Sequence, residues 1–161
     1  MATIKKFYTA KNYTLEDSVG FLLRSLTQVV SREVESRMTE HGLTDAQWKP
    51  LLFIRLGRGD TAAELARCTC IDTGAVTRML DRLEDKALVQ RVRSAEDRRV
   101  VNLILTEEGA YLADKVIPSV LSDTLNEVLA GFSTSEYEQF KSLLLRALDN
   151  ANRMNEKGET A

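Results

Sequence analysis

Arginine side chains gather in one short stretch of the chain, and they carry its clearest chemistry. Between Leu88 and Arg99 the sequence holds four arginines, including Arg98, against Glu96 and Asp97. A guanidinium offers several N–H donors that fit phosphates and the edges of bases. The whole chain has a net charge of -2, but charge has to be considered segment by segment. This stretch therefore keeps nucleic acid open as a partner.

The sequence contains few of the residues that catalytic and metal-binding sites need. Cys68 and Cys70 lie two residues apart, and His41 is the only histidine. A zinc site or a nucleophile–histidine pair needs more of these residues. No Gly-rich phosphate loop is present either. We therefore expect no enzyme, no metal site and no cofactor, with packing as the favoured role of the two cysteines and redox chemistry as the alternative.

Length and composition predict one integrated globular domain. The chain has 161 residues, of which 29% are charged and 43% hydrophobic, as in ordinary soluble proteins. The longest stretch without a charged residue, Val128 to Ser135, has eight residues, against about 20 apolar residues for a membrane-spanning helix. The N-terminus lacks the apolar run of a signal peptide. We expect a cytoplasmic protein.

Helix starts are marked by Ser or Thr followed three residues later by an acid or amide, since each side chain then satisfies a backbone N–H. Such pairs begin at Thr14, Thr44, Thr61 and Ser133. Two β-branched-rich runs, by contrast, flank a polar turn and predict a hairpin. The predicted helices span about 15–41, 45–57, 61–68, 73–87, 107–130 (kinked at Pro118) and 135–153, and the strands span 88–93 and 100–105.

The order helix, turn, helix and hairpin predicts a mainly α fold with a small β-hairpin wing, a winged helix-turn-helix. At 100° per residue, one side of helix 73–87 is apolar and the other combines small residues, hydroxyls and arginines. That second side suits a DNA groove. The alternative is an ordinary solvated helix face. The candidate DNA-binding residues here are Thr73, Gly74, Ala75, Thr77, Arg78 and Arg82.

Several blocks of the sequence resemble the MarR family of bacterial transcription regulators. The segment Asp97 to Gly109, with its Asp-x-Arg followed by a strand and Leu-Thr, is similar to the wing signature of that family. Leu43 to Leu51, Glu64 to Ala66, and Leu83 to Val89 resemble its helices in their usual order. The resemblance covers roughly residues 15–153.

The resemblance implies a homodimer in which each subunit presents a winged helix to half of a pseudo-palindromic DNA operator. It implies that Arg99 enters the minor groove and that Asp97 orients it, with Arg98 as a second donor. The alternative for Asp97 is a simple turn acid. Arg93 is a candidate phosphate contact at the base of the wing, with a solvated strand residue as its alternative.

The outer parts of the chain are expected to form the dimer. Residues 1–42 and 107–161 would make a helical dimerisation region around a DNA-binding region, 43–106. The last two helices are too apolar to cover each other, which predicts a partner subunit. The interface candidates are Leu125, Val128, Leu129, Phe132, Phe140, Leu144 and Leu148.

By resemblance, the function is that of a repressor released from its operator when a small aromatic or phenolic acid binds. Such an acid needs an apolar slot and a cationic anchor, and Arg24 and Lys49 are the candidate anchors beside Phe21, Trp48 and Tyr111. The alternative for the three aromatic residues is core packing. The alternative for the whole protein is a winged-helix module that binds protein and no DNA.

Overall fold

The computed structural model describes residues 6–69 and 71–158, with side chains described up to residue 154. The chain divides into two compact units, residues 1–124 and residues 125–161. No helix among the described residues is both long and apolar enough to cross a membrane.

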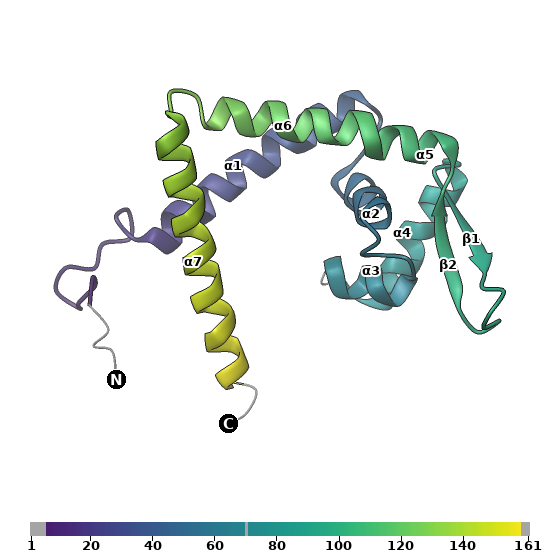
Figure 1. Cartoon of the computed structure of the whole chain (residues 1–161), viewed down its shortest axis with the longest axis horizontal. Coiled ribbons are helices and arrows are strands. Elements are labelled where there is room, and N and C mark those ends of the chain that lie inside the picture. Colours follow the sequence, from purple (N-terminus) through teal and green to yellow (C-terminus); the bar gives the residue numbers. More distant parts are fainter. Residues whose placement is uncertain (1–5, 70, 159–161) are drawn as a thin grey trace. The chain divides into compact units, whose positions relative to one another are not determined.

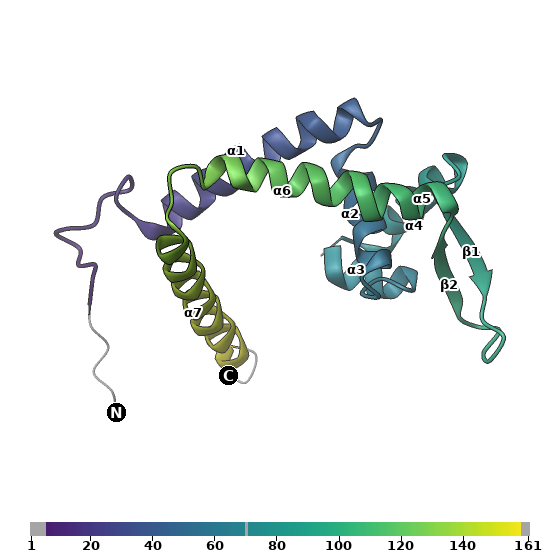
Figure 2. The same ribbon diagram turned by 45° about the horizontal axis from the view of Figure 1, so that its top comes forward.

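The first unit begins with four helices. They are α1 (Val19–Glu40), α2 (Asp45–Arg55), α3 (Ala62–Thr69) and α4 (Thr73–Asp85). Figures 1 and 2 both show α2, α3 and α4 grouped together beside the hairpin. The mainly helical architecture and the helix-turn-helix are therefore confirmed.

The predicted capping residues set most of the helix starts. Thr44 and Gln47 form the reciprocal capping box at α2, and Thr61 and Glu64 exchange the same pair of hydrogen bonds at α3. The start predicted at Thr14 is wrong. Its hydroxyl donates to the Asp17 carboxylate, and the Ser18 Oγ accepts from the Phe21 N–H to begin α1.

The helix α4 ends two residues earlier than predicted. Ala87 has a φ of +53°, in the left-handed region that disfavours residues with a Cβ. The N–H groups of Ala87 and Leu88 donate to the carbonyl oxygens of Glu84 and Leu83 at 2.8 and 2.9 Å. This pair of bonds is the Schellman motif. It turns the chain out of α4 and directly into the hairpin.

The hairpin consists of β1 (Val89–Arg93) and β2 (Val101–Leu105), which pair antiparallel with Val89 opposite Leu105 and Arg93 opposite Val101. Its base is anchored on the β2 side. The Leu103 N–H donates to the Asp60 carbonyl at 2.8 Å, and Asn102 forms a bridge with Thr61. The predicted wing is confirmed.

A close backbone contact joins the hairpin to the next helix, α5 (Glu107–Tyr111). The Thr106 Oγ1 accepts from the Gly109 N–H at 3.0 Å and donates to the Ala87 carbonyl at 2.7 Å. A Cβ on Gly109 would lie 2.0 Å from the Leu88 carbonyl oxygen. Only glycine fits this contact without moving the backbone.

The predicted kink at Pro118 takes the form of a π-helical turn just before it. The turn η1 (Leu112–Val116) connects α5 to α6 (Ile117–Val128), and the Ile117 N–H donates to the Leu112 carbonyl five residues earlier. Pro118 lacks an N–H, so the helix must change its bonding pattern near this residue. The Arg55 Nε also donates to the Asp114 carboxylate at 2.5 Å, tying α2 to η1.

The core of the first unit is formed by buried side chains of α1, α2, α3, α4, the hairpin, η1 and the start of α6. Leu51, Leu65, Val76 and Leu83 are among its fully buried side chains. Pro50 is buried inside α2. This core fixes the orientation of α4 and leaves its other face to solvent.

The second unit contains the end of α6 and the helix α7 (Thr134–Gly158). The predicted box at Ser133 is present, because the Glu136 carboxylate accepts from the Ser133 N–H at 2.8 Å and from its hydroxyl at 2.7 Å. Both bonds lower the pKa of Glu136, and the backbone bond has the larger effect. The rings of Phe132 and Phe140 meet edge to face at 6.0 Å.

Candidate nucleic-acid interface

The helix α4 divides into a buried and an open face, as its sequence predicts. Its N-cap is Asp72, whose carboxylate accepts from the Ala75 N–H at 2.9 Å. Asp72 is not one of the predicted capping residues, although Asp is a preferred N-cap residue. Val76, Met79, Leu80 and Leu83 are buried, Ala75 is half-buried, and Thr73, Gly74, Thr77, Arg78 and Arg82 are exposed.

Five exposed arginines occur on α4 and the hairpin without a side-chain partner. In the part of the chain that the structure describes, no hydrogen bond or ion pair engages their guanidinium groups. Unpaired guanidinium groups are free to bind phosphates or base edges. The five residues are Arg78, Arg82, Arg93, Arg98 and Arg99.

The tip of the hairpin is organised by side chains that bind its own backbone. The Asp97 Oδ1 accepts from the Arg99 backbone N–H at 2.9 Å, and the Ser94 hydroxyl accepts from the N–H groups of Glu96 and Asp97. Asp97 thus contacts the backbone of Arg99. It fixes the turn from which the Arg99 side chain extends.

Arg91 differs from the other arginines of the hairpin, and no local pattern in the sequence predicts its role. Its guanidinium donates to Asp81, to Glu84 and to the Thr77 carbonyl, and its backbone N–H also donates to Glu84. All these acceptors belong to α4. The Arg91 guanidinium is therefore paired within the protein, whereas that of Arg93 has no partner among the described residues.

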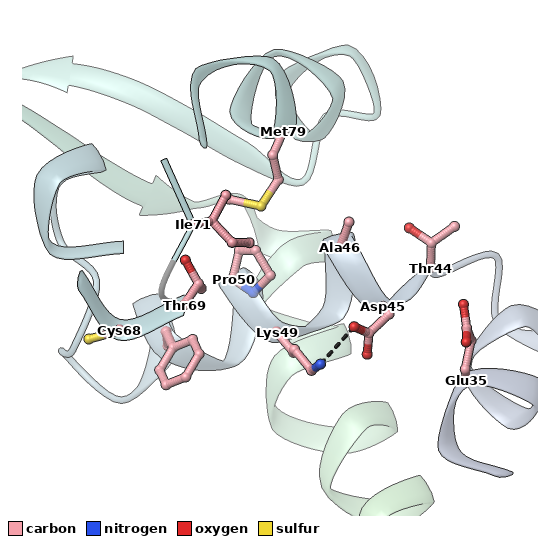
Figure 3. Close-up of a pocket in the computed structure, with 11 residues that line it drawn as sticks. Glu35, Thr44, Asp45, Ala46, Lys49, Pro50, Cys68, Thr69, Ile71 and Met79 are labelled. Atoms are coloured by element: carbon pink, nitrogen blue, oxygen red, sulfur yellow. Dashed lines mark hydrogen bonds and ion pairs between the residues drawn. The ribbon is translucent and has the colours of Figure 1, made fainter. Parts of the chain in front are cut away.

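The residues predicted to hold an aromatic acid do not all meet in one place. A pocket of 720 Å³ lies between α1, α2, α3 and α4, and of the five predicted residues only Lys49 lines it (Figure 3). Trp48 is 8% exposed and its indole N–H is buried, as expected for core packing. Phe21 and Tyr111 are 38% and 57% exposed, and Arg24 is exposed.

The charges in this pocket are already partly paired. The Lys49 Nζ lies 2.6 Å from the Asp45 carboxylate and 5.4 Å from the centre of the Trp48 ring. Glu35 of α1 adds a second carboxylate to the lining (Figure 3). An acid at Lys49 would therefore compete with Asp45 for the ammonium.

Of the two cysteines, only Cys68 lies among the described residues. Cys68 is exposed and its thiol donates to the Arg58 carbonyl, whereas Cys70 lies outside the described residues. Within residues 6–69 and 71–158, no group of three His, Cys, Asp or Glu side chains could hold a metal ion. His41 caps the end of α1 through its backbone N–H.

Comparison with known proteins agrees with this geometry. The model of the MarR family matches residues 41–100. Wild-type MarR from E. coli is 31% identical over 81% of this chain and 97% of its own, with a TM-score of 0.71. A cysteine-to-serine mutant of E. coli MarR complexed with operator DNA is 32% identical over 81% of this chain and 93% of its own, with a TM-score of 0.69.

A third solved structure extends the likeness to another bacterium. It is a probable transcriptional regulator from Pseudomonas aeruginosa, 25% identical over 83% of this chain and 99% of its own, with a TM-score of 0.69. The matches span nearly the whole length of these relatives. The chain therefore belongs to the MarR family of winged-helix, DNA-binding transcriptional regulators.

Proposed function

We propose that this regulator binds a specific double-stranded operator through α4 and the wing. The observation that carries the proposal is the set of five unpaired arginines, two on α4 and three on the hairpin. Arg78 and Arg82, with the small and hydroxyl residues Thr73, Gly74, Ala75 and Thr77, would read the major groove. Arg93 would contact phosphate. Arg98 and Arg99 would enter the minor groove, with Asp97 holding the turn.

We further propose that the protein acts as a homodimer on a pseudo-palindromic operator. The last two helices leave large apolar side chains open, since Leu125, Phe132 and Leu148 are 46%, 47% and 58% exposed. A second copy would cover them together with Val128, Leu129, Phe140 and Leu144. In this arrangement residues 1–42 and 107–161 form the dimerisation region and residues 43–106 read DNA. Each subunit then binds one half-site, about 34–36 Å from the other.

The DNA proposal is tested with genomic fragments that the protein retains, by fluorescence anisotropy over a range of salt concentrations. Affinity for the retained operator should fall steeply with salt, because phosphate contacts release counterions. Arg99→Ala should weaken operator binding about 5- to 150-fold, or about 1–3 kcal/mol. The variant should dimerise as the wild type does.

Arg78→Ala separates base reading from phosphate binding. It should reduce the difference in affinity between operator variants, since base-edge contacts carry the specificity. If every sequence weakened equally, Arg78 would be a phosphate contact. If the wild-type protein retained no fragment and showed no salt-dependent binding, the chain would be a winged-helix module that binds protein.

Light scattering at micromolar concentration tests the dimer. The expected mass is twice that of the 18.1 kDa chain. Leu148→Glu would place a charge in the proposed apolar interface and should shift the mass towards the monomer. A wild-type protein that is monomeric at this concentration would contradict the dimer.

We propose that the protein represses transcription and that a small aromatic or phenolic acid releases it from DNA. Lys49 is the preferred anchor of the two candidates, because it lines the 720 Å³ pocket next to the HTH helices. The acid would take the place of Asp45 on the Lys49 ammonium and lie against apolar lining such as Phe53. Release requires that the acid bind the free dimer more tightly than the DNA-bound one.

The test is a titration of salicylate and related aromatic acids into the protein–operator complex, with thermal shift of the free protein alongside. Lys49→Ala should remove the response to the acid and keep the affinity for DNA, whereas Arg24→Ala should keep both. If Arg24→Ala removed the response and Lys49→Ala kept it, the anchor would be Arg24 on α1. Release by an acid that does not stabilise the free protein would indicate competition at the DNA surface, against the pocket.

A further inference from the structure

Arg91 connects the wing to α4 through more bonds than any other described residue of the hairpin. Its Nη1 lies 2.7 Å from the Asp81 Oδ1 and 2.5 Å from the Glu84 Oε2, and its Nη2 donates to the Thr77 carbonyl at 3.2 Å. Its backbone N–H donates to the Glu84 Oε1 at 3.1 Å. One side chain thus spans two turns of α4.

The position of Arg91 along β1 makes this connection the outermost one on that strand. Val89, at the base of the strand, is buried. Beyond Arg91, Val92 and Arg93 are exposed, and among the described residues no hydrogen bond or ion pair links their side chains to α4. On β2, the corresponding contact is the backbone bridge between Asn102 and Thr61. The segment from Arg93 to Val101 therefore extends beyond two contacts, that of Arg91 with α4 and that of Asn102 with Thr61.

The charges at this contact also bear on DNA. Asp81 and Glu84 lie on the helix that faces DNA in the proposed complex, where free carboxylates would repel phosphates. The Arg91 guanidinium, 29% exposed, lies between them. An arginine suits this place because its planar fork can donate to several acceptors at once, which an ammonium on a flexible stem does less well.

We propose that Arg91 is a positioning residue that holds the wing at a fixed distance from α4 and does not itself contact DNA. The proposal rests on the proposed binding of α4 and the wing to one operator. A wing held in this way presents Arg98 and Arg99 to the minor groove while α4 lies in the major groove. Loss of the Arg91 side chain should reduce operator affinity, because α4 and the wing would no longer keep a fixed spacing.

The experiment compares Arg91→Gln with Arg93→Gln, its neighbour two residues along the same strand face, which has no side-chain partner in the described chain. In the free protein, Arg91→Gln should speed hydrogen exchange of the wing amides, and Arg93→Gln should not. On operator DNA, Arg91→Gln should lose about 10-fold in affinity with an unchanged salt slope. Arg93→Gln should lower the salt slope by about one, as expected for a lost phosphate contact.

A second variant changes the acceptors on α4 and keeps Arg91. Asp81→Asn with Glu84→Gln removes both carboxylates, and it should speed exchange in the wing as Arg91→Gln does. The proposal is overturned if Arg91→Gln lowers the salt slope by about one while wing exchange is unchanged, or if operator affinity does not change. If the wild type binds no DNA, the proposed function fails, but hydrogen exchange still tests whether Arg91 holds the wing to α4. Failure of the proposed function is therefore distinguishable from failure of the Arg91 proposal.

Discussion

Replacing Gly109 with alanine tests the contact between the wing and α5. The added Cβ would lie 2.0 Å from the Leu88 carbonyl oxygen, where ordinary contact begins at about 3.4 Å. That oxygen cannot move freely, because it accepts from the Thr106 N–H at 3.1 Å and directly precedes β1. The backbone of α5 or of the hairpin must therefore shift.

The expected loss of stability is the difference between two terms. Overpacking of this kind costs about 3 kcal/mol, whereas alanine in a helix is favoured over glycine by about 1 kcal/mol. The net loss is about 2 kcal/mol. For a protein of this size that corresponds to a melting temperature about 4–8 °C lower.

Thermal unfolding followed by circular dichroism measures the effect. The control is Gly20→Ala in α1, where a Cβ would meet nothing within 4 Å, so only the helix preference should act and the melting temperature should not fall. Gel filtration of both variants checks that the oligomeric state is the same. A Gly109→Ala protein as stable as the wild type would show that the close contact is not a constraint.

Three further predictions follow from local features. Ala87→Gly should raise the melting temperature by about 2–4 °C, since glycine removes a cost of about 1 kcal/mol at a positive φ; no increase in a thermal melt would contradict the strain. Ser133→Ala should raise the pKa of Glu136 towards its ordinary value in an NMR titration. The Ser133 bonds lower the pKa of Glu136 in the folded wild type, so they add stability above the ordinary pKa, and this stability is lost as pH falls through the lowered pKa. The backbone bond remains in the variant, so an unchanged pKa of Glu136 would count against the hydroxyl bond alone. Asp114→Asn removes the half-exposed ion pair with Arg55 and should cost under about 1 kcal/mol; a larger loss in a denaturant titration would give the pair a structural role.

Local sequence signals predicted most of the helix starts because capping is a short-range interaction. Thr44 and Thr61 act as predicted, since the partner three residues later is on the same turn. Thr14 shows the limit of the rule, because Ser18, four residues later, caps α1 in its place. The expectation that the chain is not an enzyme is confirmed by its membership in a family of transcription regulators.

Long-range contacts could not be predicted in the same way. Ala87 continues the apolar spacing of α4, yet the chain leaves the helix before it because the Schellman bonds close at Leu83 and Glu84. The pairing of Arg91 with α4 joins residues seven to fourteen positions apart, and no periodicity marks such a pair. The five predicted effector residues lie on three helices, α1, α2 and α5, so the distances between the helices depend on packing.

The π turn η1 has a consequence for how this helix can change over evolution. A π turn holds an extra residue, and it places Leu112 and Ile117, five positions apart, among the buried side chains. In an α-helix each residue turns the chain by about 100°. Losing one residue between 112 and 116 would leave Leu112 and Ile117 four positions apart, and four such steps bring an α-helix back to nearly the same face. The π turn thus allows the helix to lose its extra residue while α6 keeps the same side towards the core and the wing is unaltered.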